Sequence, residues 1–404
     1  MKTFKLLRLL AGLYLLVFIT SCVEPFSPST ISYENLLVVD GKITNEQKKH
    51  QIKLSRTYRI DTTGYFPERN ANLYITTNLN TKYQFSEIEE GIYESIESFS
   101  AKRNETYTLH IETKNGEVFT SNEETLTSES FINNLIADVE VNNTGDEVVT
   151  IKVSSASPNN DAQFYKFEYE ETYKIVAPYY SNYYLEPYDY SLSGGSYKVR
   201  KLIRPVNKRV CYKTQYSNGI ILTETTGLDE DRIENFPVRS FQTNDFMISY
   251  RYSILIKQFI QSYDAHNYYE ILKKFSNSDN VFSENQVGFL SGNIKSISDP
   301  DEKVIGYFEV NSVSEKRIFI NREDIRSTYI SFPDECYTFA PTFYDISGAR
   351  PLLDALLNGY IYFDENNNPN PDPLTPEGPY VVVKEICGDC TVLGSIVKPD
   401  FWID

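Results

Sequence analysis

Apolar residues recur at every second position over much of the chain after residue 36, and this alternation is the strongest constraint on its fold. Ile52 and Leu54, for example, alternate with polar neighbours. A period of two places successive side chains on opposite faces of a strand, so these segments suit half-buried β-strands. They recur at intervals of roughly 8 to 12 residues with turn residues between them, which is typical of antiparallel sandwiches. The pattern predicts a mainly β protein.

The composition supports packed domains and excludes one class of partner. Of 404 residues, 41% are hydrophobic, and 32 Tyr with 24 Phe provide ample aromatic material for cores. This is too apolar for an intrinsically disordered chain. The formal net charge of −17 repels a phosphate backbone, so we expect no nucleic-acid partner.

The first 21 residues have the pattern of a signal peptide. A basic start precedes an apolar stretch over residues 9–19, which is too short to cross a hydrocarbon core of about 30 Å. Residues 19–22 read Ile-Thr-Ser-Cys, similar to a bacterial lipobox, in which cleavage leaves the cysteine first. We therefore expect Cys22 to carry acyl chains, including palmitate, that anchor the protein to a membrane. An ordinary secretory signal with a nearby cysteine is the alternative.

Three further segments are predicted after the signal peptide. Residues 22–33 are rich in proline and hydroxyl side chains, which suits an extended tether. Residues 34–127 have the strand spacing of an N-terminal β-sandwich and look similar to prealbumin-like modules. Residues 128–404 form a second β region, whose opening resembles a fibronectin-type sandwich and which ends in a cysteine-containing tail.

Two helices interrupt the second region. Over residues 262–275, apolar side chains recur at spacings of three and four, with Asp264 near the start and Lys273 and Lys274 near the end. These charges match the helix dipole. Over residues 350–358, a leucine-rich stripe follows an early proline and is itself followed by Gly359.

A tyrosine-rich insertion over residues 178–205 is the one segment with a functional interpretation. Tyrosine offers a large, rigid contact area at low entropic cost, so such a segment favours a surface that binds a partner or a ligand. The alternative is that the tyrosines pack over the protein's own sheets. The candidate surface residues are Tyr179, Tyr180, Tyr183, Tyr184, Tyr188 and Tyr190.

Four cysteines remain once Cys22 is set aside. In a compartment outside the reducing cytosol, Cys211, Cys336, Cys387 and Cys390 are expected to form two disulfides. We favour pairing Cys336 with Cys387 or Cys390, which would attach the tail to the last domain. A redox CxxC motif at residues 387–390 and a four-cysteine zinc site are weaker alternatives.

The sequence offers no recognisable catalytic chemistry. The motifs HExxH, GxSxG, GxGxxG and GxxxxGK[ST] are absent, and none of the three histidines has a partner at metal-ligand spacing. We therefore predict no catalytic residue, no metal and no cofactor, and we do not expect an enzyme.

Short motifs in a fixed order carry a resemblance to a known family. They comprise ENLLVVDGKI from residue 34, CYKTQ from 211, RYSILIKQ from 251, GNI from 292, VIGYF from 304, KRIFI from 316, CGDCT from 387 and KPDFW from 398. Together they resemble the domain of unknown function 4249 family, outer-membrane lipoproteins of Bacteroidota commonly encoded beside TonB-dependent transporters. The family has no agreed activity. The resemblance therefore implies a cellular location and a transporter as partner, but no catalytic residue.

The expected function follows from the association of this family with TonB-dependent transporters. We expect a lipid-anchored outer-membrane lipoprotein on the extracellular face, which docks on a β-barrel of the TonB-dependent transporter class and assists ligand capture or gating. A scaffold subunit of a larger outer-membrane assembly or secretion complex is one alternative. A stand-alone surface lipoprotein that binds a glycan or a peptide is the other.

Overall fold

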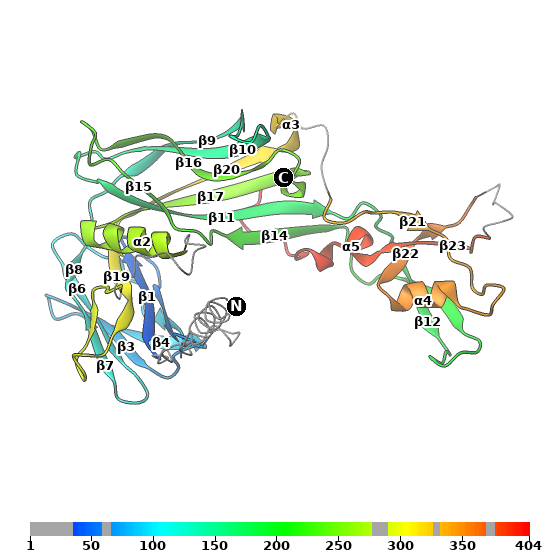
Figure 1. The fold of residues 1–404 in the computed structure, drawn as a ribbon, viewed down its shortest axis with the longest axis horizontal. Coiled ribbons are helices and arrows are strands. Elements are labelled where there is room, and N and C mark those ends of the chain that lie inside the picture. Colours follow the sequence, from blue (N-terminus) through cyan, green and yellow to red (C-terminus); the bar gives the residue numbers. More distant parts are fainter. Residues whose placement is uncertain (1–34, 59–65, 277–289, 326–331, 369–375) are drawn as a thin grey trace, which may run out of the picture.

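The computed structural model describes residues 35–58, 66–276, 290–325, 332–368 and 376–404. The predicted signal peptide, the tether and Cys22 lie outside the described residues. The described chain is mainly β, with several largely antiparallel sheets and a few short helices (Figure 1). The predicted fold class is therefore confirmed.

The N-terminal unit is one strongly curved sheet. Its strands from the first part of the chain are β1 (Leu37–Thr44), β2 (Gln51–Arg56), β3 (Asn72–Thr77), β4 (Lys82–Glu89), β5 (Ile92–Ser95), β6 (Thr106–Glu112), β7 (Val118–Ser121) and β8 (Glu124–Thr125). Alternation along β1 sends Leu37, Val39 and Ile43 into the core. They pack there with large buried rings such as Tyr93 and Phe119.

Two strands from much later in the chain complete this sheet. They are β18 (Ile294–Ser296) and β19 (Val304–Asn311). The order is β18-β7-β6-β3-β4-β5-β2-β1-β19, and β19 pairs in parallel with β1. Asn293 links the two ends of this order, because its Nδ2 donates to the Phe308 carbonyl at 2.9 Å and its Oδ1 accepts from the Phe308 N–H at 2.8 Å.

The predicted boundary at residue 127 therefore needs correction. A contiguous unit over residues 34–127 would leave the outer edge of β1 unpaired, and β19 supplies the missing partner. Local periodicity identifies both strands but carries no information about which strands pair across such a long separation.

A two-sheet sandwich follows the N-terminal unit. One sheet contains β9 (Phe131–Val141), β10 (Glu147–Ala156) and β16 (Arg232–Gln242). The other contains β11 (Phe164–Val176), β14 (Val210–Tyr216), β15 (Ile221–Glu224), β17 (Arg251–Ile260) and β20 (Val313–Asn321). Both sheets contribute to one core, with Val149 and Ile151 from the first and Phe167 and Ile254 from the second.

Three helical segments accompany the sandwich: η1 (Phe246–Ile248), α2 (Tyr263–Ser276) and α3 (Arg322–Ile325). The helix predicted over residues 262–275 corresponds to α2. It lies between the sandwich and the N-terminal unit (Figure 1), and its Tyr268 packs against Tyr307 of β19.

A smaller C-terminal lobe lies at the far end of the sandwich from the N-terminal unit (Figure 1). It contains β12 (Tyr183–Tyr188), β13 (Lys198–Ile203), β21 (Thr338–Phe339), α4 (Pro351–Leu357), β22 (Tyr360–Glu365) and β23 (Tyr380–Lys384). The tyrosine-rich insertion supplies the β12–β13 hairpin, and the helix predicted over residues 350–358 corresponds to α4. Leu185, Leu352, Tyr362 and Val382 form the core of the lobe.

The tail after β23 returns to the sandwich. It passes through α5 (Glu385–Gly388) and η2 (Cys390–Val392), and Ser395 then bridges to Tyr212 of β14. Trp402 is buried against Tyr212 and Phe319, with ring centroids 5.0 and 5.8 Å away. Among the described residues, no helix has both the length and the apolar character needed to cross a membrane.

Substitution of Gly306 tests how much the β1–β19 pairing contributes to stability. A Cβ at this position would lie 2.0 Å from the Val39 carbonyl oxygen, and its φ is +131°. We expect Gly306→Ala to lower the free energy of unfolding by about 3 kcal/mol or more, because the β1–β19 pair must separate. Chemical denaturation of the purified protein measures this.

Gly116→Ala is the matched control for that substitution. Gly116 also has a positive φ, of +85°, but no atom lies within 4 Å of the added Cβ. We expect it to cost only about 1 kcal/mol, from backbone strain alone. Equal losses in the two variants would contradict the importance of the close approach at Gly306.

Candidate functional site

A cleft separates the N-terminal unit from the sandwich. Its floor is the outer face of β1 and β19, where Val38, Asp40 and Tyr307 point away from the N-terminal core. The opposite walls come from β11, from α2 and from the loop after β14. The cleft encloses about 570 Å³, a volume within the usual range for small-molecule sites.

Four charged side chains join the two units beside this cleft. Lys42 Nζ lies 2.7 Å from Glu168 Oε1, and Lys166 Nζ lies 3.2 Å from Glu309 Oε1. Lys166 also approaches Glu168 at 3.7 Å. Because Lys42 and Glu309 belong to the N-terminal sheet and the other two to β11, each of the two closest ion pairs crosses between units. We call these four residues the interdomain charge cluster.

Glu309 is the most buried member of the cluster. Its Oε2 accepts hydrogen bonds from Gln261 Nε2 and Asn311 Nδ2, both at 2.8 Å. Burial alone would raise the pKa of Glu309, but the charges of Lys166 and Lys42 and the two amide donors outweigh it and lower the pKa to about 2. Glu309 is therefore a carboxylate at neutral pH.

The two lysines differ in their surroundings. Burial lowers the pKa of Lys42, helped by the nearby charge of Lys166. For Lys166, burial acts in the same direction, but Glu309 and Glu168 outweigh it and raise the pKa. Each ammonium also lies 3.7 Å from the centre of an aromatic ring, Lys42 over Phe259 and Lys166 over Tyr269.

The sequence analysis missed the interdomain charge cluster. Its signal was present, since Glu309 is a single charge inside an otherwise largely apolar strand and Lys42 is one of two charges in β1, together with Asp40. A charge on the outer face of a strand is usually solvated, so only the arrangement of the two units reveals that these are buried partners. The described residues contain no group of three or more His, Cys, Asp or Glu side chains placed to hold a metal ion.

The six candidate tyrosines divide into two groups. Tyr179 packs edge-on against Phe363, and Tyr180 packs against the sandwich core. Tyr184 on β12 is half-buried. The other three, Tyr183, Tyr188 and Tyr190, are about 40% exposed. The insertion therefore contributes to the protein's own packing and also presents rings to solvent.

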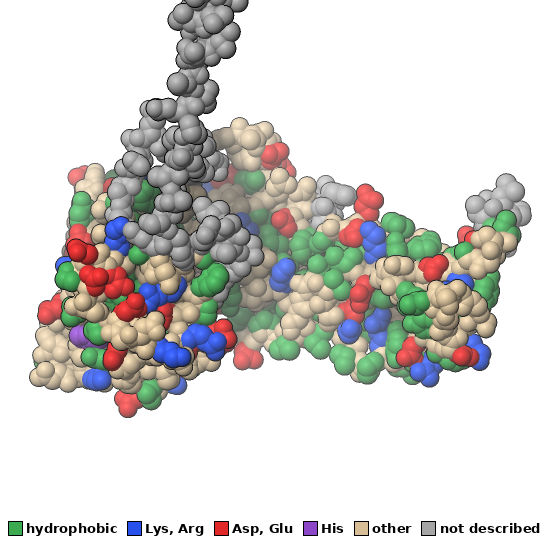
Figure 2. All heavy atoms as spheres, turned by 60° about the horizontal axis from the view of Figure 1, so that its bottom comes forward, with side chains coloured by type: hydrophobic (Ala, Val, Ile, Leu, Met, Phe, Trp, Pro, Cys, Tyr) green, Lys and Arg blue, Asp and Glu red, His purple; other side chains and the backbone are tan. Residues whose placement is uncertain are grey.

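Two neighbouring loops gather exposed apolar side chains at one end of the C-terminal lobe. We define the lobe tip as Tyr190, Leu192, Tyr344 and Ile346; Leu192 is 80% exposed and Ile346 fully exposed. Arg350 Nη1 donates to the Ser191 carbonyl at 2.8 Å, and the Tyr197 N–H donates to the Tyr344 hydroxyl at 3.2 Å. These bonds hold the two loops together. Figure 2 shows hydrophobic side chains scattered among charged ones over the half of the molecule that contains the lobe.

The four described cysteines form two disulfides. Cys211 pairs with Cys390, and Cys336 pairs with Cys387. The second pair agrees with the favoured prediction for Cys336. Because Cys387 and Cys390 have different partners, the structure supports neither a redox CxxC disulfide nor a four-cysteine zinc site.

Asp389 stands between the two tail cysteines and anchors the base of the lobe. Its buried carboxylate lies 2.7 Å from Lys208 Nζ and 3.6 Å from Arg204 Nη1. Burial would raise its pKa, but the hydrogen bonds from Lys208 and Thr391 outweigh burial and lower it. The CGDC motif is thus a structural junction between tail, lobe and sandwich.

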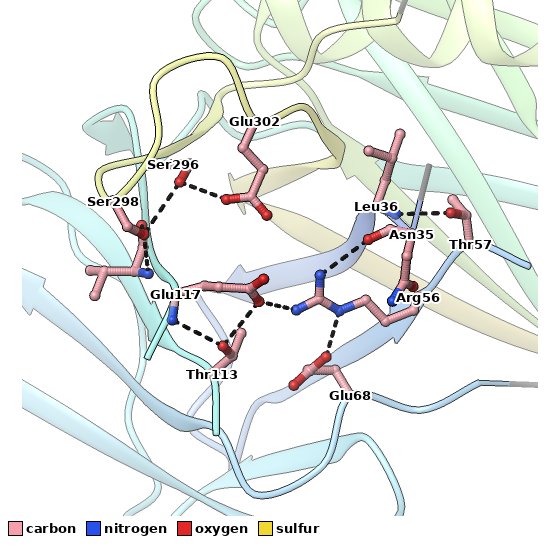
Figure 3. Close-up of polar contacts among 11 residues, drawn as sticks. Asn35, Leu36, Arg56, Thr57, Glu68, Thr113, Glu117, Ser296, Ser298 and Glu302 are labelled. Atoms are coloured by element: carbon pink, nitrogen blue, oxygen red, sulfur yellow. Dashed lines mark hydrogen bonds and ion pairs between the residues drawn. The ribbon is translucent and has the colours of Figure 1, made fainter. Parts of the chain in front are cut away.

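A second polar cluster holds the start of the described chain (Figure 3). Arg56 Nη1 donates to the Asn35 carbonyl at 3.2 Å, and Arg56 Nε donates to Glu68 Oε2 at 2.6 Å. Its remaining nitrogen pairs with Glu117. Arg56 therefore fixes the point at which the chain enters β1 to the end of β2 and to the loop before β7.

The interdomain charge cluster predicts a pH-dependent stability. A depressed carboxyl pKa stabilises the fold above its ordinary value of 4.5, and this contribution is lost as pH falls through about 2. We expect Glu309→Gln to lower the free energy of unfolding at pH 7 by about 3 kcal/mol and to flatten its fall between pH 5 and pH 2.

Urea unfolding at several pH values measures both effects. Glu315→Gln is the control, since Glu315 is half-exposed and lies 3.8 Å from Lys257. We expect that substitution to change stability by less than about 0.5 kcal/mol. A wild-type pH profile in Glu309→Gln would contradict the role of the cluster.

The Cys336–Cys387 disulfide is expected to hold the lobe together. It closes a loop of 51 residues that contains most of the lobe, so removing it with Cys336→Ser and Cys387→Ser should cost about 4 kcal/mol of lobe stability. We expect limited proteolysis to cut this variant first within the lobe, leaving the N-terminal unit intact. An unchanged cleavage pattern would show that packing alone suffices.

Comparison with known proteins gives a family. A match to the domain of unknown function DUF4249 covers residues 23–317, which run from just after Cys22 into β20. The CGDCT and KPDFW motifs of the tail lie beyond the matched residues. No curated protein matches the chain. Because the match covers well over half of the 404 residues, the chain belongs to the DUF4249 family.

Proposed function

We propose that this protein is a lipid-anchored lipoprotein of the outer membrane that faces the extracellular side and docks on a TonB-dependent transporter through its lobe tip. In this role it assists ligand capture or gating by the barrel. The lobe tip is the observation that carries the proposal, because exposed Leu192 and Ile346 are costly to leave in water and are typical of residues that a partner covers.

The construction of the lobe supports a docking role. The Cys336–Cys387 disulfide lies within its segment, the Cys211–Cys390 disulfide joins its base to β14, and Asp389 adds a salt bridge at the junction. A pre-organised surface loses little conformational entropy when it binds. The exposed Tyr183, Tyr188 and Tyr190 add rings of the kind enriched at binding hot spots.

The position of the proposed anchor is compatible with this role. The described chain begins at Asn35 in the N-terminal unit, and the lobe lies at the other end of the long axis (Figure 1). The predicted tether of residues 22–33 would reach about 40 Å when fully extended. A lipid at Cys22 would therefore hold the body near the membrane while leaving the lobe free to approach a neighbouring barrel.

A stand-alone ligand-binding role is the second candidate, and the cleft favours it. A volume of about 570 Å³ lined by tyrosines is larger than packing defects between domains usually are. In that case the isolated protein would bind its ligand without any barrel.

Affinity purification from native outer membranes tests the docking proposal. The full-length tagged protein, extracted in mild detergent, should retain one stoichiometric TonB-dependent barrel identified by mass spectrometry. We expect the double variant Leu192→Ser with Ile346→Ser to retain at least tenfold less of that barrel, because its apolar contacts are lost.

The control variant combines Leu79→Ser with Val141→Ser, two residues of similar exposure, 64% and 65%, outside the lobe. It should retain the barrel at the wild-type level. Recovery of several assembly or secretion components would favour the scaffold alternative, and equal retention by both double variants would refute docking through the lobe tip.

A further inference from the structure

Asp40 is an unusual carboxylate on the floor of the cleft. It lies in the middle of β1, a central strand that pairs with β2 on one side and with β19 on the other. Its neighbours Val39 and Gly41 face the N-terminal core, so the Asp40 side chain faces the sandwich across the cleft. Within the described part of the chain, its carboxylate has no hydrogen bond or ion pair, and the residue is exposed.

The other charges around the cleft are compensated. Within the interdomain charge cluster, two lysines balance two glutamates. Glu170 pairs with Arg317 at 2.8 Å, and Lys257 approaches Glu315 at 3.8 Å. Lys53 faces Asp40 across the β1–β2 pair but does not line the cleft, and Lys166 is engaged by Glu309 and Glu168. Among the residues that line the cleft, Asp40 therefore contributes a negative charge without an ion pair, in a chain whose formal net charge is already −17. This site attracts a cation.

The walls of the cleft suit an aromatic or apolar body attached to that cation. Tyr268 and Tyr307 border Asp40, and Val38, Leu272 and Ile305 add aliphatic surface. Burial, with a smaller contribution from Asp40, raises the pKa of Tyr268 to about 12, so its ring stays neutral at physiological pH. Neutral tyrosine rings attract an ammonium group through their faces and pack against flat or aliphatic groups.

We propose that this cleft binds a small organic cation, a protonated primary amine carried on an aromatic or apolar body, with Asp40 as the counter-charge of the ammonium. The volume of about 570 Å³ accommodates a ligand of a few tens of atoms at most. A free arylalkylamine and the lysine side chain of a short peptide present the same chemistry. The proposal concerns a different surface from the lobe tip and does not depend on a barrel partner.

Calorimetric titration of the full chain in mild detergent tests the proposal. The probes are phenethylamine and its uncharged analogue 2-phenylethanol, which has the same ring and chain length. We expect the amine to bind at least tenfold more tightly than the alcohol and to bind more weakly as salt is raised. Absence of saturable amine binding at about 10 mM, or equal affinity for the two probes, would overturn it.

A second pair of probes distinguishes the two sources of the amine. The peptide Gly-Lys-Gly, with both ends blocked, is compared with the same peptide containing norleucine in place of lysine. Tighter binding of the lysine peptide than of phenethylamine would identify a peptide ligand within the proposed class. The reverse order would identify a free amine.

Substitutions locate the binding. Asp40→Asn removes the charge while preserving shape and should weaken phenethylamine binding at least tenfold. Asp229→Asn is the matched control, an exposed loop aspartate outside the cleft, and should leave the affinity unchanged. Equal affinity in Asp40→Asn and wild type would overturn the assignment.

A second variant keeps the test decisive if Asp40→Asn unfolds the protein. Asn218 is an exposed loop residue that lines the cleft, so Asn218→Trp should fill the cleft without disturbing a core. We expect it to abolish amine binding while thermal unfolding stays at the wild-type temperature. Retained binding in a folded Asn218→Trp protein would place the amine elsewhere and refute the proposal.

Discussion

The parallel pairing of β1 with β19 is the interaction on which the rest of the structure depends. It joins Leu37–Thr44 to Val304–Asn311 residue by residue and so completes the N-terminal sheet. The same pairing places Glu309 beside β1, where it reaches Lys166 of the sandwich, and places Gly306 against the Val39 carbonyl. Without it, the cleft would lose half of its floor and the interdomain charge cluster would lose its most buried member.

The interdomain charge cluster contributes specificity more than net stability. Burying ions costs solvation free energy that their attraction only partly recovers, so an apolar interface could be equally stable. The alternation of two lysines and two glutamates nevertheless favours one relative placement of β1, β11 and β19. A shift of one strand by one residue would separate the ion pairs and bury an unpaired charge. The amide donors from Gln261 and Asn311 complete the coordination of Glu309.

The sequence predicted the class of fold and many local elements but not their long-range assembly. Period-two alternation identified the strands, and i, i+3, i+4 spacing identified the segment of α2, because both signals are local. Strands β18 and β19 join the N-terminal sheet by pairing with strands more than 170 residues away in the chain. Local periodicity carries no information about such pairings. The cleft escaped prediction for the same reason. Asp40 and Tyr268 are ordinary residues of a strand and a helix. They line the same cleft only because the two units face each other.

The late arrival of β19 sets the order in which the chain can finish folding. Synthesis proceeds from the N-terminus, so strands β1 to β8 emerge while the edge of β1 still lacks its partner. More than 250 residues separate Thr44, at the end of β1, from Val304, at the start of its partner strand. During that interval the nascent protein carries an exposed sheet edge, which invites pairing with other chains. Such high contact order slows folding, so the chain spends longer with this edge open than it would if the partner strand came next in the sequence.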